Sequence, residues 1–282
     1  MKVADVMTPR EDVVTVSLPG TRDDVLEYLQ ERRFSAVPVV KGADGEEVYR
    51  GLVSREDLIE SPDEDQLALL MRDVPTTTGD TDVVDVAHLM VEENARRVPV
   101  VDGDALAGIV TVTDVVRAIA DGDVAGDETV GDLARRDVNT TYVGTPLPVA
   151  EREIAYADVP YAIVLDDEAD MTGILTEVDI IDVARVVEGE DDVGASVAGQ
   201  DDEWMWEGIK ATGNRYFPTR NVEIPSEAVS EFMTADPVTL TKRRTAQEAA
   251  QKMLETDVEQ LPLVAGDALA GIVRDVDLIA AL

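Results

Sequence analysis

A regular order of apolar and polar positions recurs along the chain, and residues 76–119 show it most clearly. Apolar residues first return at helical spacing, then form a continuous run typical of a buried strand, a turn, and a partner strand. A second helix follows. The predicted strand, helix, two strands and helix span residues 76–78, 83–91, 98–101, 106–111 and 113–119. The pattern therefore predicts the order β-α-β-β-α.

The same pattern occurs four times. The octapeptide GDALAGIV stands at 103–110 and again at 266–273, and each copy follows a proline flanked by apolar residues. Residues 37–57 and 159–179 repeat the arrangement with a longer hairpin. Because long and short hairpins alternate, we infer that a two-repeat unit was duplicated and that a pair of repeats is the functional unit.

Each predicted repeat is short, about 55–60 residues, so a single repeat has a marginal core and packing in pairs is favoured. The predicted divisions are four repeats, a Gly-rich acidic linker and an aromatic insert. In chain order they are repeat 1 at 1–60, repeat 2 at 65–121, the linker at 122–129, repeat 3 at 130–185, the insert at 186–228 and repeat 4 at 229–282.

The insert departs from the repeat pattern. Its periodicity is weak, yet it contains Trp204, Trp206, Tyr216 and Phe217. A merely solvated linker would not gather such large apolar groups. Three roles stay open for it: a structural strap, a cover over a cleft of the second pair, and a peptide that binds a partner.

The charge balance narrows the range of partners. The chain has 60 acidic and 24 basic residues and a formal net charge of −36. Such a protein repels nucleic acid and anionic membranes, since both are bound through Lys and Arg. With 45% hydrophobic residues it has enough apolar material to fold. The composition resembles that of proteins from salt-accumulating halophiles, in which about 1 M salt shortens the screening length to roughly 3 Å.

The sequence also lacks several features that particular chemistries and cellular locations require. Cysteine is absent and histidine occurs once, so thiol chemistry is excluded and no metal site is expected. The N-terminus lacks the apolar core of a signal peptide, and no apolar stretch is long enough to cross a membrane. A cytoplasmic location is the resulting expectation.

A short motif, G-x-x-[ST]-x-x-D, closes the second strand of each hairpin. Its copies are Gly51, Ser54, Asp57; Gly108, Thr111, Asp114; Gly173, Thr176, Asp179; and, without the hydroxyl, Gly271, Arg274, Asp277. A carboxylate in the first turn of a helix is able to accept two hydrogen bonds from a ribose diol. The same residues also form a capping box, in which both side chains satisfy backbone N–H groups at the start of a helix. Both interpretations stay open at this point.

Taken together, these features resemble the cystathionine β-synthase (CBS) domain. The features are the proline strand, the motif, Met-Thr-Pro at 7–9 with its variant at 233–237, and the β-α-β-β-α order, in four copies. The resemblance implies an α/β (α+β) fold whose four repeats pack as two Bateman pairs. It further implies that adenosine-type ligands such as AMP, ADP, ATP or S-adenosylmethionine bind in clefts between the two repeats of a pair. The motif Asp would contact ribose, the Ser or Thr would lie beside it, and the backbone before the strand proline would meet adenine.

Carried onto this sequence, the resemblance gives candidate ligand-binding residues in three repeats. Repeat 2 carries the most complete set. The candidates are Arg96, Arg97, Val98, Thr111 and Asp114 in repeat 2, Ala36, Val37, Ser54 and Asp57 in repeat 1, and Thr176 and Asp179 in repeat 3. The two arginines suit a phosphate unless surrounding carboxylates hold them. Asp158 disfavours a phosphate in repeat 3, and repeat 4 departs from the pattern.

The sequence thus predicts a stand-alone regulatory protein that binds an adenosine-containing small molecule and signals to an unidentified protein. It predicts no catalytic residue and no required cofactor, because the chain offers no nucleophile and base pair for a hydrolase. The alternative is an interaction scaffold whose sites stay empty and whose motifs only cap helices. Whether the four repeats assemble alone or as a homodimer is left open.

Overall fold

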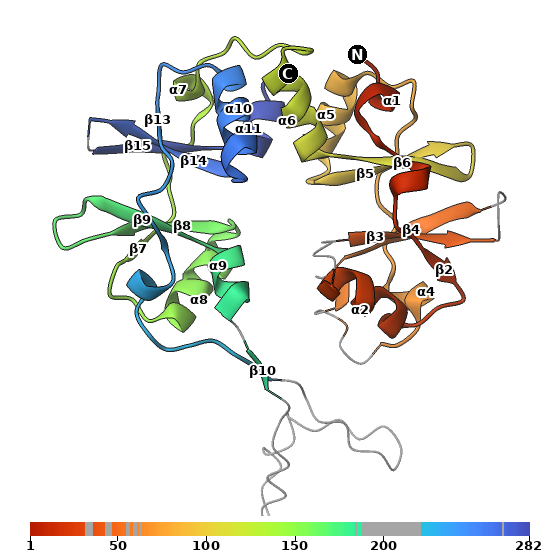
Figure 1. Ribbon diagram of the computed structural model, residues 1–282, viewed down its shortest axis with the longest axis horizontal. Helices are drawn as coiled ribbons and strands as arrows, with labels where there is room; N and C mark the ends of the chain where they lie inside the picture. Colours follow the sequence, from red (N-terminus) through yellow and green to blue (C-terminus); the bar gives the residue numbers. More distant parts are fainter. Residues whose placement is uncertain are drawn as a thin grey trace, which may run out of the picture. The chain divides into compact units, whose positions relative to one another are not determined.

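The computed structural model describes most of the chain (Figure 1). The described residues are 1–31, 36–42, 47–54, 57–58, 61, 64–183, 185–187, 221–266 and 268–282. They form two compact units, the first comprising residues 1–136, 238–265 and 270–282, and the second residues 137–237 and 266–269. The four aromatic residues of the predicted insert lie outside the described residues.

Repeat 2 forms the predicted order of elements. Helix α5 (Val83–Glu92) is followed by strands β5 (Arg97–Asp102) and β6 (Ala105–Thr111) and by helix α6 (Val112–Asp121). The predicted first strand is reduced to Thr77, which pairs in parallel with Val100 of β5. The turn at Gly103 has a left-handed φ of 60°, a conformation that glycine adopts without strain.

Repeats 3 and 4 follow the same order, and the described residues of repeat 1 follow it as far as the second strand of the hairpin. Repeat 1 has β2 (Val16–Leu18), α2 (Arg22–Glu31), β3 (Ala36–Lys41) and β4 (Val48–Ser54). Repeat 3 has β7 (Thr140–Tyr142), α8 (Leu147–Ala157), β8 (Tyr161–Leu165), β9 (Met171–Thr176) and α9 (Glu177–Val183). Repeat 4 has β13 (Leu240–Thr241), α10 (Ala246–Thr256), β14 (Gln260–Ala265), β15 (Ala268–Arg274) and α11 (Asp275–Ile279). In repeats 1 and 3 the first strand is parallel to the second, and the second pairs with the third as an antiparallel hairpin. The fold is therefore α+β with four repeats.

The first residues of each repeat pack on the other repeat of its pair. We call these four stretches the exchanged segments. They comprise α1 (Val3–Val6), β1 (Thr8–Pro9) and η1 (Arg10–Asp12); α4 (Leu67–Leu70) with Arg72; α7 (Val130–Leu133) with Arg135; and η2 (Val229–Glu231) with β12 (Thr234–Ala235). β1 pairs with β6 of repeat 2, Arg72 with Leu52 of repeat 1, Arg135 with Ile272 of repeat 4, and β12 with β9 of repeat 3. Repeats 1 and 2 are thus one pair, and repeats 3 and 4 the other.

The exchange accounts for the motif glycines. A Cβ atom on Gly108 would lie closer than 3.0 Å to the carbonyl oxygen of Thr8. Gly51, Gly173 and Gly271 meet the carbonyl oxygens of Arg72, Thr234 and Arg135 in the same way. Because a side chain would collide with the crossing backbone, each motif glycine leaves room for an exchanged segment.

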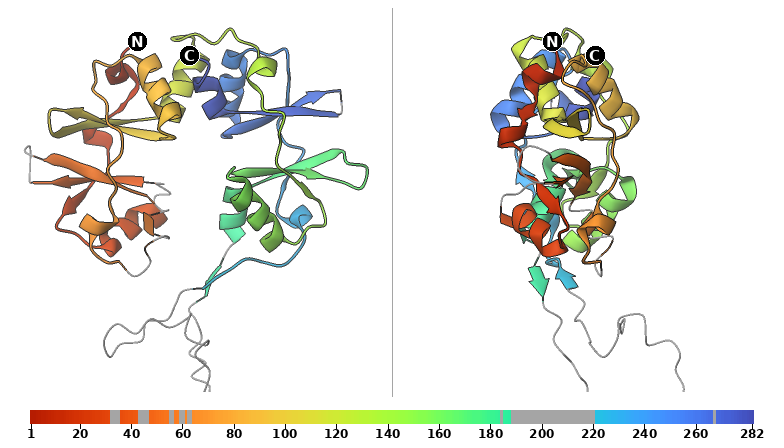
Figure 2. Two further views of the ribbon diagram at one scale, coloured as in Figure 1. Left: turned by 180° about the vertical axis from the view of Figure 1, so that it is seen from behind. Right: turned by 90° about the vertical axis from the view of Figure 1, so that its right-hand side faces the viewer.

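Among the described residues, three hydrophobic cores hold the repeats together. One core joins repeats 2 and 4 within the first unit, because α6 packs on α10 and α11 and shares residues such as Ile119 and Leu278 with them. Figures 1 and 2 show these helices side by side. Repeat 1 and the second unit have separate cores. No described helix has the length and apolarity needed to cross a membrane.

The segments around the predicted insert and linker also have defined neighbours. β10 (Arg185–Val187) pairs antiparallel with β11 (Asn221–Glu223) just outside the undescribed stretch. In the linker, the carbonyl oxygens of Gly126 and Glu128 accept hydrogen bonds from the first backbone N–H groups of α10. The linker therefore caps the first turn of a helix of repeat 4.

Candidate functional site

The candidate residues before the strand proline lie next to the motif hydroxyl. In repeat 2, Arg97 of β5 is the cross-strand partner of Thr111 of β6. In repeat 1, Ala36 is the partner of Ser54. Val98 and Val37, the following residues, are fully buried. The hairpin register therefore brings together most of the candidates that the sequence separates.

The motif of repeat 2 forms a complete capping box at the start of α6. Asp114 Oδ2 accepts hydrogen bonds from the backbone N–H of Thr111 at 2.9 Å and from its hydroxyl at 2.8 Å. The Thr111 hydroxyl oxygen accepts in turn from the Asp114 backbone N–H at 3.3 Å. One oxygen of the carboxylate is thus used to begin the helix.

The same box recurs in repeats 1 and 3, and repeat 4 keeps only the half that its aspartate supplies. Ser54 donates to Asp57 Oδ2 from its backbone at 2.7 Å and from its hydroxyl at 2.6 Å. Thr176 donates to Asp179 Oδ2 at 2.8 and 2.7 Å. In repeat 4 the backbone of Arg274 donates to Asp277 Oδ2 at 3.0 Å, and its guanidinium adds a bond at 3.2 Å. The capping interpretation therefore holds in full in repeats 1, 2 and 3, and in repeat 4 for the aspartate alone, because the guanidinium of Arg274 cannot accept a backbone N–H.

What differs between the repeats is the environment of the second oxygen, Oδ1. Asp57 is only 5% exposed and forms an ion pair with Arg72. Asp277 Oδ1 accepts from Arg274 at 3.1 Å and faces Arg135 Nε at 3.4 Å. Asp114 Oδ1 contacts Arg117 of its own helix at 3.1 Å, a side chain that is 55% exposed. In the pair of repeats 1 and 2, the carboxylate of Asp114 is therefore less enclosed than that of Asp57.

Arg72 and Arg135 come from the exchanged segments, and sequence reasoning missed both. Each lies five residues after the buried residue that begins its segment's helix, Leu67 or Val130. At the same place the other two segments carry Thr8 and Thr234. The sequence did contain a signal for Arg72, because Met71-Arg72 stands at the start of repeat 2 where Met7-Thr8 stands at the start of repeat 1.

Arg96 is held by repeat 4. Its guanidinium forms two hydrogen bonds with Asp275, at 2.6 and 3.3 Å, and lies 3.1 Å from Glu259. Asp275 is 5% exposed. Burial acts to lower the pKa of Arg96, but the hydrogen bonds and charges of Asp275 and Glu259 together outweigh it, and the pKa is raised above its ordinary value. A role of Arg96 toward phosphate stays a prediction, and it would require the side chain to leave this pair.

Comparison with known proteins gives the family. The sequence profile of the CBS domain matches residues 3–64, 67–121, 130–185 and 229–282. An uncharacterized protein of Methanocaldococcus jannaschii, MJ1404, is 27% identical over 98% of this chain, which spans 61% of that protein's length.

Two solved structures are similar over the whole chain. An uncharacterized conserved protein from Pyrococcus horikoshii is 26% identical, with a TM-score of 0.70, and the match covers 100% of this chain and 99% of that one. MJ1225 from M. jannaschii, which has been proposed as an archaeal homologue of g-AMPK, has a TM-score of 0.69 at 19% identity, with the same coverage. The second likeness concerns the fold alone. The profile matches account for most of the sequence, and this chain belongs to the CBS domain family.

Proposed function

We propose that this protein is a regulatory nucleotide-binding protein that binds an adenosine-type ligand in repeat 2 and signals its presence to another protein. The observation that carries the proposal is the placement of Arg97, Thr111 and Asp114. The strand register sets Arg97 opposite Thr111, and the capping box fixes Asp114 three residues further on. An acceptor for ribose and a cation for phosphate then lie at one end of the same hairpin.

The capping box does not preclude ribose binding, because it uses only one carboxylate oxygen. Asp114 Oδ1 faces a single exposed arginine, and such surface ion pairs contribute at most about 1 kcal/mol. A ribose diol is able to replace that contact. Asp57 offers less, because the buried carboxylate is already paired with Arg72. Repeat 2 is therefore the proposed primary site.

Repeat 3 is the proposed second site. Its Thr176 and Asp179 form the same box, but Asp158 stands two residues before the strand proline, Pro160. A phosphate there would face a like charge. Adenosine itself or S-adenosylmethionine, which carries a positive sulfonium, suits this repeat better.

Calorimetric titration tests the proposal. The full chain in about 1 M KCl is titrated separately with AMP, ADP, ATP and S-adenosylmethionine. We expect saturable binding of at least one adenine nucleotide and a loss of affinity of at least tenfold in the double variant Asp114→Ala, Arg97→Ala. Asp114→Asn, which retains an acceptor for the cap, separates ligand loss from unfolding, and Asp85→Asn on α5 is the matched surface control. Silence with every adenosine compound would overturn the proposal.

A second candidate function is an interaction scaffold that binds no nucleotide. The observation in its favour is that all four motif aspartates cap helices and that Arg96 already pairs with Asp275. Under this alternative the titrations give no heat, and Asp114→Asn changes stability alone. Turnover assays with ATP and Mg²⁺ test the absence of hydrolysis.

A further inference from the structure

Repeats 2 and 4 meet through equivalent helices. Within the first unit, α6 of repeat 2 packs on α10 and α11 of repeat 4, and α5 also contacts α11 (Figures 1 and 2). The two repeats align without a gap from the first residue of α5 and of α10 onward, which places Thr111 of one motif against Arg274 of the other. Each repeat therefore offers the same face to its partner, and a second copy of either repeat competes for the partner's place.

The apolar part of the contact does not distinguish the two repeats. Every described apolar residue that repeat 4 buries in the shared core has a buried apolar counterpart in repeat 2. The counterparts are Val83 and Ala246, Val86 and Ala249, Ala87 and Ala250, Met90 and Met253, Val98 and Leu261, Val100 and Leu263, Val110 and Val273, Val115 and Leu278, and Val116 and Ile279. Because apolar burial is non-directional, these residues do not by themselves choose between partners.

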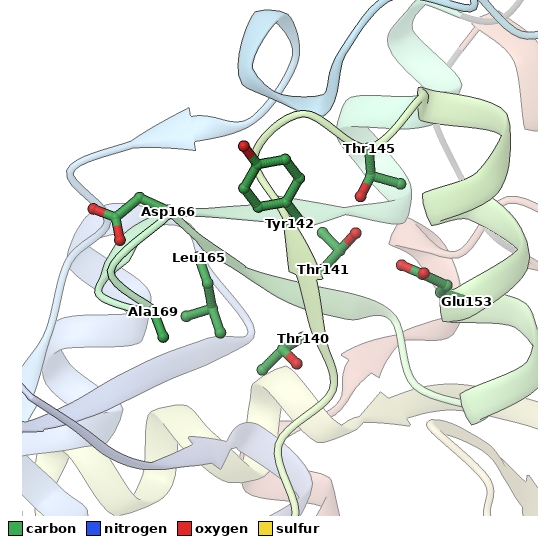
Figure 3. A pocket seen from close by; sticks show the side chains of 8 residues that line it. All are labelled: Thr140, Thr141, Tyr142, Thr145, Glu153, Leu165, Asp166 and Ala169. Atoms are coloured by element: carbon green, nitrogen blue, oxygen red, sulfur yellow. The ribbon is translucent and has the colours of Figure 1, made fainter.

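The equivalence breaks down at the first residue of the second helix. Val112 of α6 is 2% exposed and belongs to the core, whereas its counterpart in α11, Asp275, is a carboxylate that is 5% exposed. Asp275 Oδ2 accepts from Arg96 at 2.6 Å, and Oδ1 accepts from Arg96 at 3.3 Å and from the backbone N–H of Val276 at 2.7 Å. In repeat 3, by contrast, Glu153 (Figure 3) has an oxygen that is closed to solvent and makes no hydrogen bond to any described residue. Asp275 is thus a buried charge whose partner is supplied by the other repeat.

Arg96 and Glu259 are themselves counterparts. The carbonyl oxygen of Arg96 accepts the backbone N–H of Val112 at 3.0 Å, and the carbonyl oxygen of Glu259 accepts that of Asp275 at 2.8 Å. The side chains of Arg96 and Glu259 meet at 3.1 Å across the contact. A residue that contacts its own counterpart lies near the axis that relates the two repeats, so two copies of one repeat would bring identical side chains together there.

The charges therefore favour one of three pairings. Repeat 2 against repeat 4 joins Arg96 to two carboxylates. Two copies of repeat 2 would place Arg96 against Arg96, and two copies of repeat 4 would place Glu259 and Asp275 against the same two acids. Like charges at this spacing repel, and salt screens the repulsion of Asp275 little because that carboxylate is buried.

We propose that Arg96, Glu259 and Asp275 select repeat 4 of the same chain as the partner of repeat 2 and exclude a second copy of either repeat. Asp275 contributes most, because it is buried and hydrogen-bonded, whereas the side chain of Glu259 is 59% exposed and forms a weaker surface pair. The apolar helices supply the affinity, and the charges supply the specificity. This role of Arg96 requires no nucleotide, so it is independent of the proposed function.

Charge exchange in the full chain, at about 1 M KCl, tests the proposal. Arg96→Glu leaves only acids at the contact, and Glu259→Arg with Asp275→Val, which copies the valine of repeat 2, leaves only arginines. We expect Arg96→Glu to lower the melting temperature by about 10 °C, because it leaves a buried carboxylate unpaired, and the second chain to melt lower by a smaller amount. Arg152→Glu on α8, an equal change of charge on a side chain that is 68% exposed, is the matched control and should leave the melting temperature unchanged.

Two further measurements separate specificity from destabilisation. All three substitutions in a single chain restore opposite charges at positions 96 and 259, and we expect most of the lost melting temperature to return. When the chain with only acids and the chain with only arginines are co-expressed, opposite charges meet only between chains. Light scattering should then find a species of twice the mass of one chain, which neither chain forms alone. Equal melting temperatures of Arg96→Glu and Arg152→Glu, no recovery in the chain with three substitutions, a dimer of either chain alone, or a co-expressed pair that stays monomeric would each overturn the proposal.

Discussion

Repeats 1 and 2 carry the same motif in the same capping box, yet their carboxylates stand in different environments. In repeat 1 the second oxygen of Asp57 is buried and faces Arg72, a residue of the exchanged segment that crosses the motif glycine. In repeat 2 the crossing segment supplies Thr8, and the second oxygen of Asp114 faces an exposed arginine of its own helix.

This difference shows that the motif alone does not fix the environment of its aspartate. Under the proposed function, we expect the residue that the partner repeat places beside the acid to decide whether a repeat binds a ligand. In repeat 4, Arg135 lies beside the motif aspartate as Arg72 does in repeat 1. In repeat 3, the crossing segment supplies Thr234, as it supplies Thr8 in repeat 2. The exchanged segments thus divide the four motifs into two that are covered by an arginine and two that are not.

The largest expected effect comes from removing what both repeats share, the close crossing at the motif glycine. Gly108→Ala places a methyl group against the carbonyl of Thr8 and against Met7. Because backbone has to move, we expect a loss of roughly 2–3 kcal/mol of unfolding free energy. Denaturant unfolding at constant salt measures it.

Gly103→Ala in the turn between β5 and β6 is the matched control. It meets no atom within 4 Å, but its φ is +60°. We expect a loss of about 1 kcal/mol from backbone strain alone. Equal losses at both glycines would contradict the steric account of the crossing.

The second-largest expected effect comes from exchanging the residues at positions 8 and 72, in which the two exchanged segments differ. Thr8→Arg should cover Asp114 as Arg72 covers Asp57, and we expect nucleotide affinity to fall at least tenfold, which is about 1.4 kcal/mol. Arg72→Thr should uncover Asp57 and add a further binding event, in repeat 1. Calorimetric affinity and stoichiometry measure both changes. Unchanged binding in Thr8→Arg, with the fold intact, would show that the exchanged segment does not control access.

Much of the fold was predictable from the chain because each repeat is locally consistent. The apolar periodicity, the turn at Asp102 and Gly103 and the motif predicted the helices and strands of repeat 2, and the structure confirms their order. The pairing of repeats followed from the alternation of hairpin lengths. These features depend on short-range pattern, which a sequence displays directly.

The missed features all depend on contacts between residues far apart in sequence. Nothing near Arg96 indicates that Asp275, 179 residues later, holds its guanidinium. Arg72 lies in what a linear interpretation assigns to the start of repeat 2, and only the exchange brings it to Asp57. An alignment of the four repeats would have shown that Thr8 of repeat 1 corresponds to Arg72 of repeat 2. The consequence for Asp57 follows only once it is known that the first residues of each repeat pack on the other repeat of the pair.

The smallest effect concerns the cap hydroxyl that repeats 1, 2 and 3 share. Thr111→Ala removes the hydroxyl that accepts the Asp114 backbone N–H at 3.3 Å and donates to the carboxylate at 2.8 Å. We expect a loss of about 1 kcal/mol in unfolding free energy without ligand. Thr111→Ser retains the hydroxyl and serves as the control. Chemical unfolding with and without nucleotide then separates two roles of the same oxygen, because a cap alone lowers both stabilities equally. A larger loss with nucleotide present indicates that the hydroxyl also contacts the ligand, and a stability equal to that of the unchanged chain contradicts the cap.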